Sequence, residues 1–392
     1  MKNSWLSTTA VLSLGLLALT GCTPNNPENA SGEESIKVSS TENECNLSTT
    51  ETKAGTTTFS VTNDGTQVTE FYVLAEDGLR ILSEVENIGP GITRDLTVDL
   101  AQGKYQTSCK PGMVGEGIKG EFTVTDNPDA SPIAADEQEL RDQAVEQYTL
   151  YVKDQVEQLK TKTDEFADAY AAGDDEKARS LYASARLHFE RIEPVAESFG
   201  DLDPQLDARE ADLEEGQKWT GWHKIEKDLW QPNAAANDGK QYKPLTDAER
   251  KDIASQLKKD TQSLYDQTRN LELNVDQIGN GAKSLLDEVT ASKVTGEEEI
   301  WSHTDLSDFQ GNVDGARVAF ENLQPIVEKK DPELAKTLTT KFDDVQKLLD
   351  KHKDGEGFKT YDQLSEKEVR ELSDAIDALS EPLSKLTGIV LS

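Results

Sequence analysis

The sequence predicts a protein of two domains, an N-terminal β-sandwich followed by an all-α domain of two related helical bundles. Three observations predict it. Residues 36–125 contain short runs of alternating apolar and polar residues separated by turn-forming residues. Residues 137–392 space their apolar residues three and four apart instead, and one ten-residue motif occurs twice among them. A chain of 392 residues is long enough for two or three domains.

The first 22 residues have the pattern of a lipoprotein signal peptide. Lys2 supplies a short positive region, and residues 6–19 are mostly apolar but too short to span a membrane comfortably. The lipobox 19–22 ends in Cys22, which we expect to be lipidated and to become the mature N-terminus. Residues 23–35 would then tether the protein to the extracytoplasmic face of the cell membrane. An ordinary secretory signal is the alternative.

The β-sandwich is predicted over residues 36–125. Its strand-like runs are rich in Thr, Val and aromatic residues, and the clearest are 56–61, 70–75, 96–100 and 121–124. Turn-forming residues separate them at 63–65, 89–91 and 110–112. Short strands at this spacing favour a small β-sandwich.

Residues 126–136 read as a linker because Asp, Asn, Pro and Ser dominate them. From Glu137 onward the apolar residues follow the helical period, first at positions 145, 148, 152, 156 and 159. Strand signals are few from there to the C-terminus, so the second domain, 137–392, is predicted to be all-helical.

An internal repeat divides the helical domain. Segment 186–195 resembles segment 317–326, with Arg, Phe, Glu and Pro at matching positions, and an Asp-Pro pair follows each copy. Related helical units of this size favour two similar bundles packed together. The second copy has Gln324 where the first has Glu193, and it lacks a His-x-x-Glu pair. Metal chemistry is therefore expected mainly in the first bundle.

The composition is strongly acidic, with 75 Asp and Glu against 41 Lys and Arg and a formal net charge of −34. Such a surface repels nucleic acid and attracts cations, so no nucleic-acid partner is expected. Net charge alone is equally compatible with an exported protein that is merely kept soluble.

The strongest candidate for metal chemistry is His223 with Glu226. The pair lies in the predicted helical segment 219–227, where residues three apart share a face. One imidazole nitrogen and one carboxylate suit iron, zinc or copper. The alternative is a surface His–Glu pair beside the flanking tryptophans.

Further carboxylates in the helical domain could complete the site. Glu190 and Glu193 share one helix face, and Asp207 lies one turn inside a helix that Asp203 is expected to cap. Glu288 is a further donor whose direction the sequence does not fix. In so acidic a chain, a solvated acidic face explains these residues equally well, and Arg186 could neutralise part of it.

Four residues are candidates in the β-domain: Cys45, Glu70, Cys109 and Met113. Segment 109–113 resembles the ligand loop of a cupredoxin, but a blue-copper site also needs two histidines, and the first histidine here is His188. Two alternatives remain. Cys45 and Cys109 form a stabilising disulfide, or their sulfurs and Glu70 form a degenerate metal site, for copper or zinc.

Enzyme motifs are scarce. The sequence contains no His-Glu-x-x-His, no Gly-x-Ser-x-Gly and no phosphate-binding loop. We therefore expect no catalytic activity. The alternative is a zinc-dependent metallopeptidase-like hydrolase that uses His223 as a metal ligand and Glu226 as the base.

Several separated motifs resemble the imelysin-like family, and the segments before them resemble the cupredoxin-like domain of EfeO-type proteins. The motifs are Glu190-Arg191-Ile192-Glu193-Pro194, Leu202-Asp203-Pro204, the segment 219–227, the segment 301–306, the segment 84–91 and Cys109-Lys110-Pro111-Gly112-Met113. The resemblance covers nearly the whole mature chain.

The resemblance implies an exported, lipid-anchored protein that captures ferric or ferrous iron and delivers it to an EfeU-like membrane permease, beside an EfeB-like haem peroxidase. It implies a helical iron site around His223 and Glu226 with the acidic ligands Glu190, Glu193, Asp207 and Glu288. It also implies a second site at Cys45, Cys109 and Glu70. A non-catalytic surface-binding lipoprotein without metal remains a further alternative.

Overall fold

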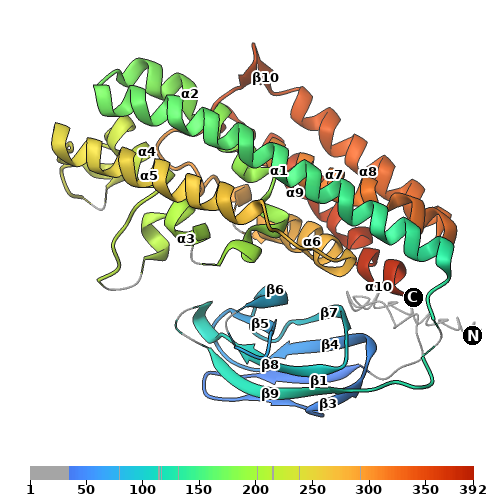
Figure 1. The fold of residues 1–392 in the computed structure, drawn as a ribbon. Helices are drawn as coiled ribbons and strands as arrows, with labels where there is room; N and C mark the ends of the chain where they lie inside the picture. Colours follow the sequence, from blue (N-terminus) through green and yellow to red (C-terminus); the bar gives the residue numbers. More distant parts are fainter. Residues whose placement is uncertain are drawn as a thin grey trace, which may run out of the picture.

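A computed structural model describes residues 35–392 except 79, 114, 116, 131, 201, 214–215, 238 and 292. The predicted signal peptide, Cys22 and residues 23–34 of the tether lie outside the described residues. The chain forms a β-sandwich and a helical domain that lies across one end of it (Figure 1). The predicted fold class, a β-domain followed by a helical domain, is thereby confirmed. Among the described residues, no helix combines the length and apolar character needed to cross a membrane.

Two sheets make up the β-domain. The first has the strand order β2-β1-β4-β7, formed by Cys45–Leu47, Ile36–Ser40, Gly55–Asn63 and Thr93–Leu100. The second has the order β3-β9-β8-β5-β6, formed by Glu51–Lys53, Ile118–Thr125, Gly103–Cys109, Thr69–Leu74 and Ile81–Ile88. The pairs β1–β4 and β3–β9 are parallel, whereas the other pairs are antiparallel.

The sandwich core follows from strand alternation. In β4, Phe59 and Val61 are buried and point inward, whereas Thr58, Ser60 and Thr62 alternate with them on the other face and are only partly buried. The rings of Phe71 and Phe122, from the opposite sheet, each lie 5.3 Å from the ring of Phe59. This aromatic cluster holds the two sheets face to face.

The described residues of the second domain form ten α-helices. They are α1 (Ala135–Ala172), α2 (Asp175–Glu190), α3 (Leu202–Asp207), α4 (Trp222–Trp230), α5 (Asp247–Thr268), α6 (Val275–Ala291), α7 (Asp305–Lys330), α8 (Pro332–Asp350), α9 (Glu366–Leu383) and α10 (Leu386–Leu391). Tyr148, Val152, Val156 and Leu159 are fully buried in α1, as their spacing predicts.

One short hairpin interrupts the helical domain. Strands β10 (Lys353–Asp354) and β11 (Gly357–Phe358) pair antiparallel, so the expectation of purely helical structure was wrong here. The physical reason is the Asp354-Gly355 pair, a strong turn signal, with Gly355 at φ 61°.

The two copies of the repeat fold differently. In the first copy, α2 ends at Glu190 and the chain continues as the short 3-10 segment η2 (Glu193–Phe199). In the second copy, α7 runs on through Pro325. The break after Glu190 brings Glu193 towards the centre of the domain, which the continuous helix of the second copy does not do.

Helix α6 forms the contact with the β-domain, over strands β6 and β7 (Figure 1). The side-chain amide of Asn280 donates to the backbone oxygen of Thr97 at 2.8 Å and to Oγ of Ser83 at 3.0 Å. Arg94 of β7 forms an ion pair with Asp287. These contacts fix the sandwich to the helical domain.

Candidate metal centre

Four segments converge on His223 inside the helical domain. They are α2, α3, the first turn of α4 and the connection between α6 and α7. Gly221, just before α4, permits this approach, because a Cβ there would lie 2.1 Å from the backbone oxygen of Leu206 and because its φ is 87°. The glycine of the Trp-Thr-Gly-Trp-His motif thus places the start of α4 against α3 and brings His223 beside Asp207.

His223 and Glu226 face each other across one helical turn, as their spacing predicts. Nδ1 of His223 lies 3.4 Å from Oε2 of Glu226, and both side chains are buried. The other oxygen of Glu226 accepts hydrogen bonds from the backbone N–H groups of Trp301, at 3.0 Å, and Ser302, at 2.7 Å. The glutamate is therefore fixed by the connection between α6 and α7.

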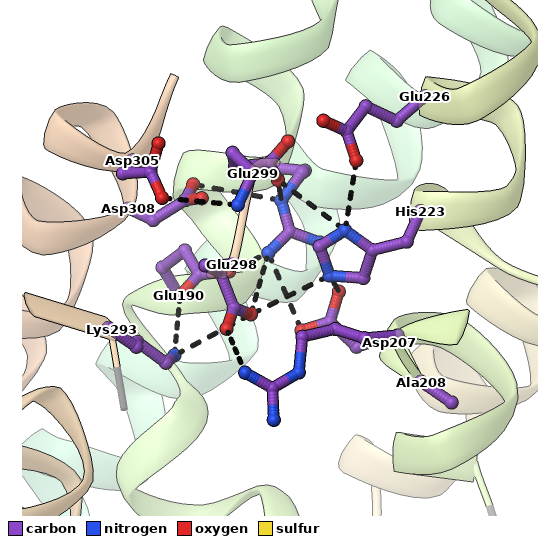
Figure 2. A network of polar contacts seen from close by, with 12 residues as sticks. Glu190, Asp207, Ala208, His223, Glu226, Lys293, Glu298, Glu299, Asp305 and Asp308 are labelled. Atoms are coloured by element: carbon purple, nitrogen blue, oxygen red, sulfur yellow. Dashed lines mark hydrogen bonds and ion pairs between the residues drawn. The ribbon is translucent and has the colours of Figure 1, made fainter. Parts of the chain in front are cut away.

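Three more carboxylates surround the imidazole (Figure 2). Nε2 of His223 lies 3.4 Å from Asp207 and 3.6 Å from Glu298, and Nδ1 lies 3.8 Å from Glu299. Two groups of possible ligands result: Asp207 with His223 and Glu298, and His223 with Glu226 and Glu299. Within each group, one ligand atom from each residue lies within 4.8 Å of the others.

Arg186 lies at the centre of these acids. Its guanidinium group is fully buried and forms an ion pair with Asp207, and Nη2 lies 2.5 Å from Glu190. It further approaches Glu299 at 2.7 Å and Glu298 and Asp308 at 3.6 Å. A buried carboxylate cluster needs such compensation, because each unpaired charge costs several kcal/mol (about 3–5 when one partner is removed).

Lys293 supplies the second buried cation. Its Nζ lies 2.7 Å from Glu193, 3.3 Å from Glu190 and 4.0 Å from Glu298. Glu190 therefore lies between Arg186 and Lys293. Burial raises the pKa of the Glu288 carboxyl, and the charge of Lys293 opposes this rise.

The electrostatics divide the carboxylates into two groups. Burial raises the pKa values of Glu193, Glu299 and Asp308 well above their usual range. Burial also opposes ionisation of Glu190 and Glu298, but the neighbouring cations, Lys293 foremost, outweigh it and lower the pKa of each. At Glu190 and Glu298 the charge of the neighbouring cations thus prevails over burial and favours the ionised carboxylate.

The surroundings of His223 favour the protonated imidazole. Burial and the charge of Arg186 oppose its protonation, but the surrounding carboxylates outweigh them and raise its pKa to about 10. A metal ion bound to a ring nitrogen would take the place of a proton.

Several buried polar atoms at the centre lack a hydrogen-bond partner within the described part of the chain. They include Nε2 of His223 and both carboxylate oxygens of Asp308. Buried polar atoms are almost always satisfied, so unsatisfied atoms on the imidazole and on a carboxylate beside Arg186 fit a bound cation. The donors are oxygen with one nitrogen, the set preferred by hard and borderline metals.

The structure brings only part of the predicted set into direct contact. His223, Glu226 and Asp207 meet, and Glu190 joins them through Arg186. Glu193 lies beside Lys293 rather than beside the imidazole. Sequence reasoning missed Glu298 and Glu299, although the acidic run 297–299, which ends two residues before Trp301, was a usable signal. It noted Arg186 only as a neutralising charge.

In the β-domain, Cys45 and Cys109 form a disulfide that links β2 to β8. The structure thus has the first of the two predicted alternatives, the disulfide. The second, a metal site that uses both cysteine sulfurs, is wrong, because sulfurs joined to each other are not thiolate ligands. Glu70 is buried, accepts a hydrogen bond from the Tyr72 hydroxyl and lies 3.9 Å from Lys110. Burial raises the pKa of its carboxyl. Met113 is 39% exposed.

Comparison with known proteins finds a matching family model for each of the two domains. An imelysin family model, which also carries the name of peptidase family M75, matches residues 144–386, and a cupredoxin-like domain model matches residues 10–124. The iron uptake system component EfeO of Escherichia coli (strain K12) is 36% identical over 365 residues, covering 92% of this chain and 93% of that protein. The EfeO proteins of Shigella flexneri and Shigella sonnei (strain Ss046) give the same values.

A solved structure shares the fold of part of this chain. It is a chain from Parabacteroides distasonis assigned as an iron-regulated protein A precursor, with a TM-score of 0.50 and 15% identity, covering 68% of this chain and 97% of that chain. At this identity the likeness concerns the fold alone. The family assignment rests on the closer matches: this chain belongs to the imelysin family, among the EfeO-type proteins that carry a cupredoxin-like domain before the imelysin domain.

Proposed function

We propose that this chain is an iron-binding component of an iron-uptake system, which captures iron outside the membrane and delivers it to a membrane permease. The relatives that share its full two-domain organisation are named as iron uptake components. The observation that carries the proposal is the buried imidazole of His223 within 3.8 Å of four carboxylates.

Iron suits this donor set. Carboxylate oxygens are hard ligands and favour the ferric ion, while one imidazole nitrogen is compatible with the ferrous ion as well. The ligands we propose are His223, Glu226, Asp207, Glu298 and Glu299. The large negative charge of the whole chain would raise the local concentration of cations around the domain.

The anchoring and the partners belong to the same proposal. A lipidated Cys22 would hold the protein on the extracytoplasmic face of the cell membrane, near an EfeU-like permease and an EfeB-like haem peroxidase. The support is the lipobox of the sequence and the resemblance to EfeO-type proteins.

The role we propose is non-catalytic, although the family model carries a peptidase name. A peptidase of the zinc type needs a second histidine and a carboxylate free to act as a base. In this chain, one oxygen of Glu226 accepts two backbone hydrogen bonds and the other faces His223. The hydrolase alternative predicts chelator-sensitive cleavage of a peptide library.

Anaerobic calorimetric titration with ferrous iron, together with competition against ferric nitrilotriacetate, tests the proposal. We expect His223→Ala and Glu226→Ala to abolish the binding seen with the wild-type protein. His352→Ala is the matched control, because His352 is also buried and lies 3.9 Å from a glutamate, Glu368, outside the cluster. Unchanged binding in the two site variants would refute the proposed site.

A further inference from the structure

We infer that Lys293 is a tethered counter-cation, whose ammonium group occupies part of the carboxylate cluster in the metal-free protein and leaves it when iron enters. The inference rests on the proposed function and concerns what sets the affinity of that site. The His-x-x-Glu pattern of the sequence does not predict a role for this lysine. The structure shows that it lies beside the carboxylates of the cluster.

The ammonium group is enclosed by acids. The side chain of Lys293 is 1% exposed, and its Nζ lies 2.7 Å from Glu193 and 3.3 Å from Glu190. An ammonium ion is a hard, compact cation that takes oxygen donors, as iron does. Lys293 therefore occupies the kind of position that a metal ion would favour.

The lysine and the metal would compete for one atom. Oε1 of Glu298 lies 4.0 Å from Nζ of Lys293 and 3.6 Å from Nε2 of His223. An ion bound by His223 through this oxygen would lie within a few Å of the ammonium group, where repulsion in a buried setting is strong. Iron and the charged lysine cannot both keep their best contacts to Glu298.

Of Arg186 and Lys293, the two long basic side chains buried against these carboxylates, Lys293 is the one able to move. Arg186 projects from the middle of α2 and contacts five carboxylates. Lys293 belongs to η5 (Lys293–Thr295), one short turn in the connection between α6 and α7. Its flexible four-carbon stem carries a point charge, so a change of rotamer moves the charge without moving a helix.

This exchange would serve a protein that must both hold and release its ion. With iron absent, Lys293 is a counter-charge for Glu190 and donates a hydrogen bond to Glu193, which limits the cost of burying both side chains. With iron bound, the ammonium group of Lys293 is displaced from the carboxylates. Because it competes with the ion for their oxygens, it lowers the affinity for iron. The lysine thus lowers the affinity to a level that permits transfer.

The experiment compares ferrous iron binding by the wild-type protein, Lys293→Met and Lys293→Arg under anaerobic conditions. We expect Lys293→Met to lower Kd on the order of ten-fold or more, because no charge has to be displaced. Lys293→Arg keeps the charge and should bind no more tightly than the wild type. Lys283→Met is the matched control, since it removes another ion-paired lysine, 16% exposed and paired with Asp287 at 2.6 Å.

Amine acetylation of the wild-type protein, read by peptide mass spectrometry, tests the movement without any variant. Lys293 should be protected without iron and should react when iron is bound, while the exposed Lys367 reacts in both states. An unchanged Kd in Lys293→Met, or protection that persists with iron, would overturn the inference. If the wild type binds no iron at all, the proposed function fails instead.

Discussion

The backbone N–H of Ser302 donates a 2.7 Å hydrogen bond to Oε1 of Glu226, a residue 76 positions earlier in the chain. The N–H of Trp301 donates to the same oxygen at 3.0 Å, while Oε2 of Glu226 faces His223. Glu226 thus has two functions: one oxygen anchors the connection between α6 and α7, and the other is a candidate ligand. The connection it anchors carries Glu298 and Glu299.

Glu226→Gln should separate these two functions. The amide oxygen can still accept the two backbone hydrogen bonds, but an uncharged NH₂ group replaces the oxygen that faces His223. We expect iron affinity to fall by about a hundred-fold or more, with a loss of stability below about 1 kcal/mol. Calorimetry and urea unfolding measure the two effects.

Glu226→Ala removes both functions and should lower stability as well as affinity, by about 1–3 kcal/mol, since two buried N–H groups lose their acceptor. Glu165→Gln, at an exposed glutamate on α1, is the control for both variants. Wild-type iron affinity in Glu226→Gln would show that the carboxylate is not a ligand.

The sequence alone could predict the architecture because its signals are local. Alternation in β4 and helical spacing in α1 depend on neighbouring residues, and so does the meeting of His223 with Glu226 one turn apart. The rest of the site was not accessible in this way. Glu298 reaches His223 only because Glu226 holds the connection between α6 and α7, and the sequence carries no trace of a contact made over 75 residues.

The repeat gives a second example of a structural difference that the sequence does not predict. Arg186 and Arg317 occupy matching positions and look equivalent in sequence. In the structure, Arg186 is completely buried among carboxylates, whereas Arg317 keeps 25% of its side chain exposed and pairs with Asp343. The two arginines differ because different parts of the chain pack around them, and the periodicity of the sequence does not predict those contacts.

Arg186→Met and Arg317→Met form a matched pair of variants. Removing Arg186 leaves several buried carboxylates without their main counter-charge, so we expect a loss of about 3–5 kcal/mol of unfolding free energy without metal. Removing Arg317 should cost at most about 1 kcal/mol. Urea unfolding of both variants measures the difference, and equal losses would contradict the central role of Arg186.

The disulfide between Cys45 and Cys109 closes a loop of 64 residues. Loss of such a loop constraint costs about 4 kcal/mol on chain entropy, so Cys45→Ser with Cys109→Ser should strongly destabilise the β-domain. Iron binding in the helical domain should persist, since no ligand is lost there. Alkylation without reduction should leave both cysteine peptides unmodified. A double variant that folds normally but loses all iron would place the iron site in the β-domain.

Asp276 makes the contact between the domains sensitive to pH. Burial raises its pKa to about 7, against hydrogen bonds that include one from the backbone N–H of Asp99 at 3.4 Å. In the unfolded chain its pKa is about 4, so the folded state binds the extra proton in this window. The contribution of Asp276 to the free energy of unfolding is therefore fully present below pH 4 and is lost as the pH rises through 7.

Asp276→Asn should therefore remove a decline on the order of 2–4 kcal/mol in unfolding free energy between pH 4 and pH 7. Denaturation curves across this range are the measurement. Asp252→Asn, at an exposed position of α5, should leave the wild-type slope intact. The same slope in Asp276→Asn would assign the pH dependence to other groups.

Gly311 sets the distance between α7 and α2 at the metal centre. A Cβ at this position would lie 2.4 Å from Cβ of Glu190 and 3.2 Å from the backbone oxygen of Leu187. Alanine is otherwise the better helix residue, by about 1 kcal/mol. We expect the clash to prevail in Gly311→Ala, with a net loss of about 1–3 kcal/mol and a higher Kd for iron, because α2 carries both Glu190 and Arg186.

Gly388 in α10 provides the control, because a Cβ there meets no atom within 4 Å. Gly388→Ala should keep iron affinity and gain up to about 1 kcal/mol of stability from helix propensity alone. The two substitutions are chemically identical, so opposite signs in urea unfolding would isolate the close helix contact as the cause. A stabilised Gly311→Ala with unchanged Kd would mean that α2 shifts without disturbing the ligands, and that the cluster tolerates movement of Arg186.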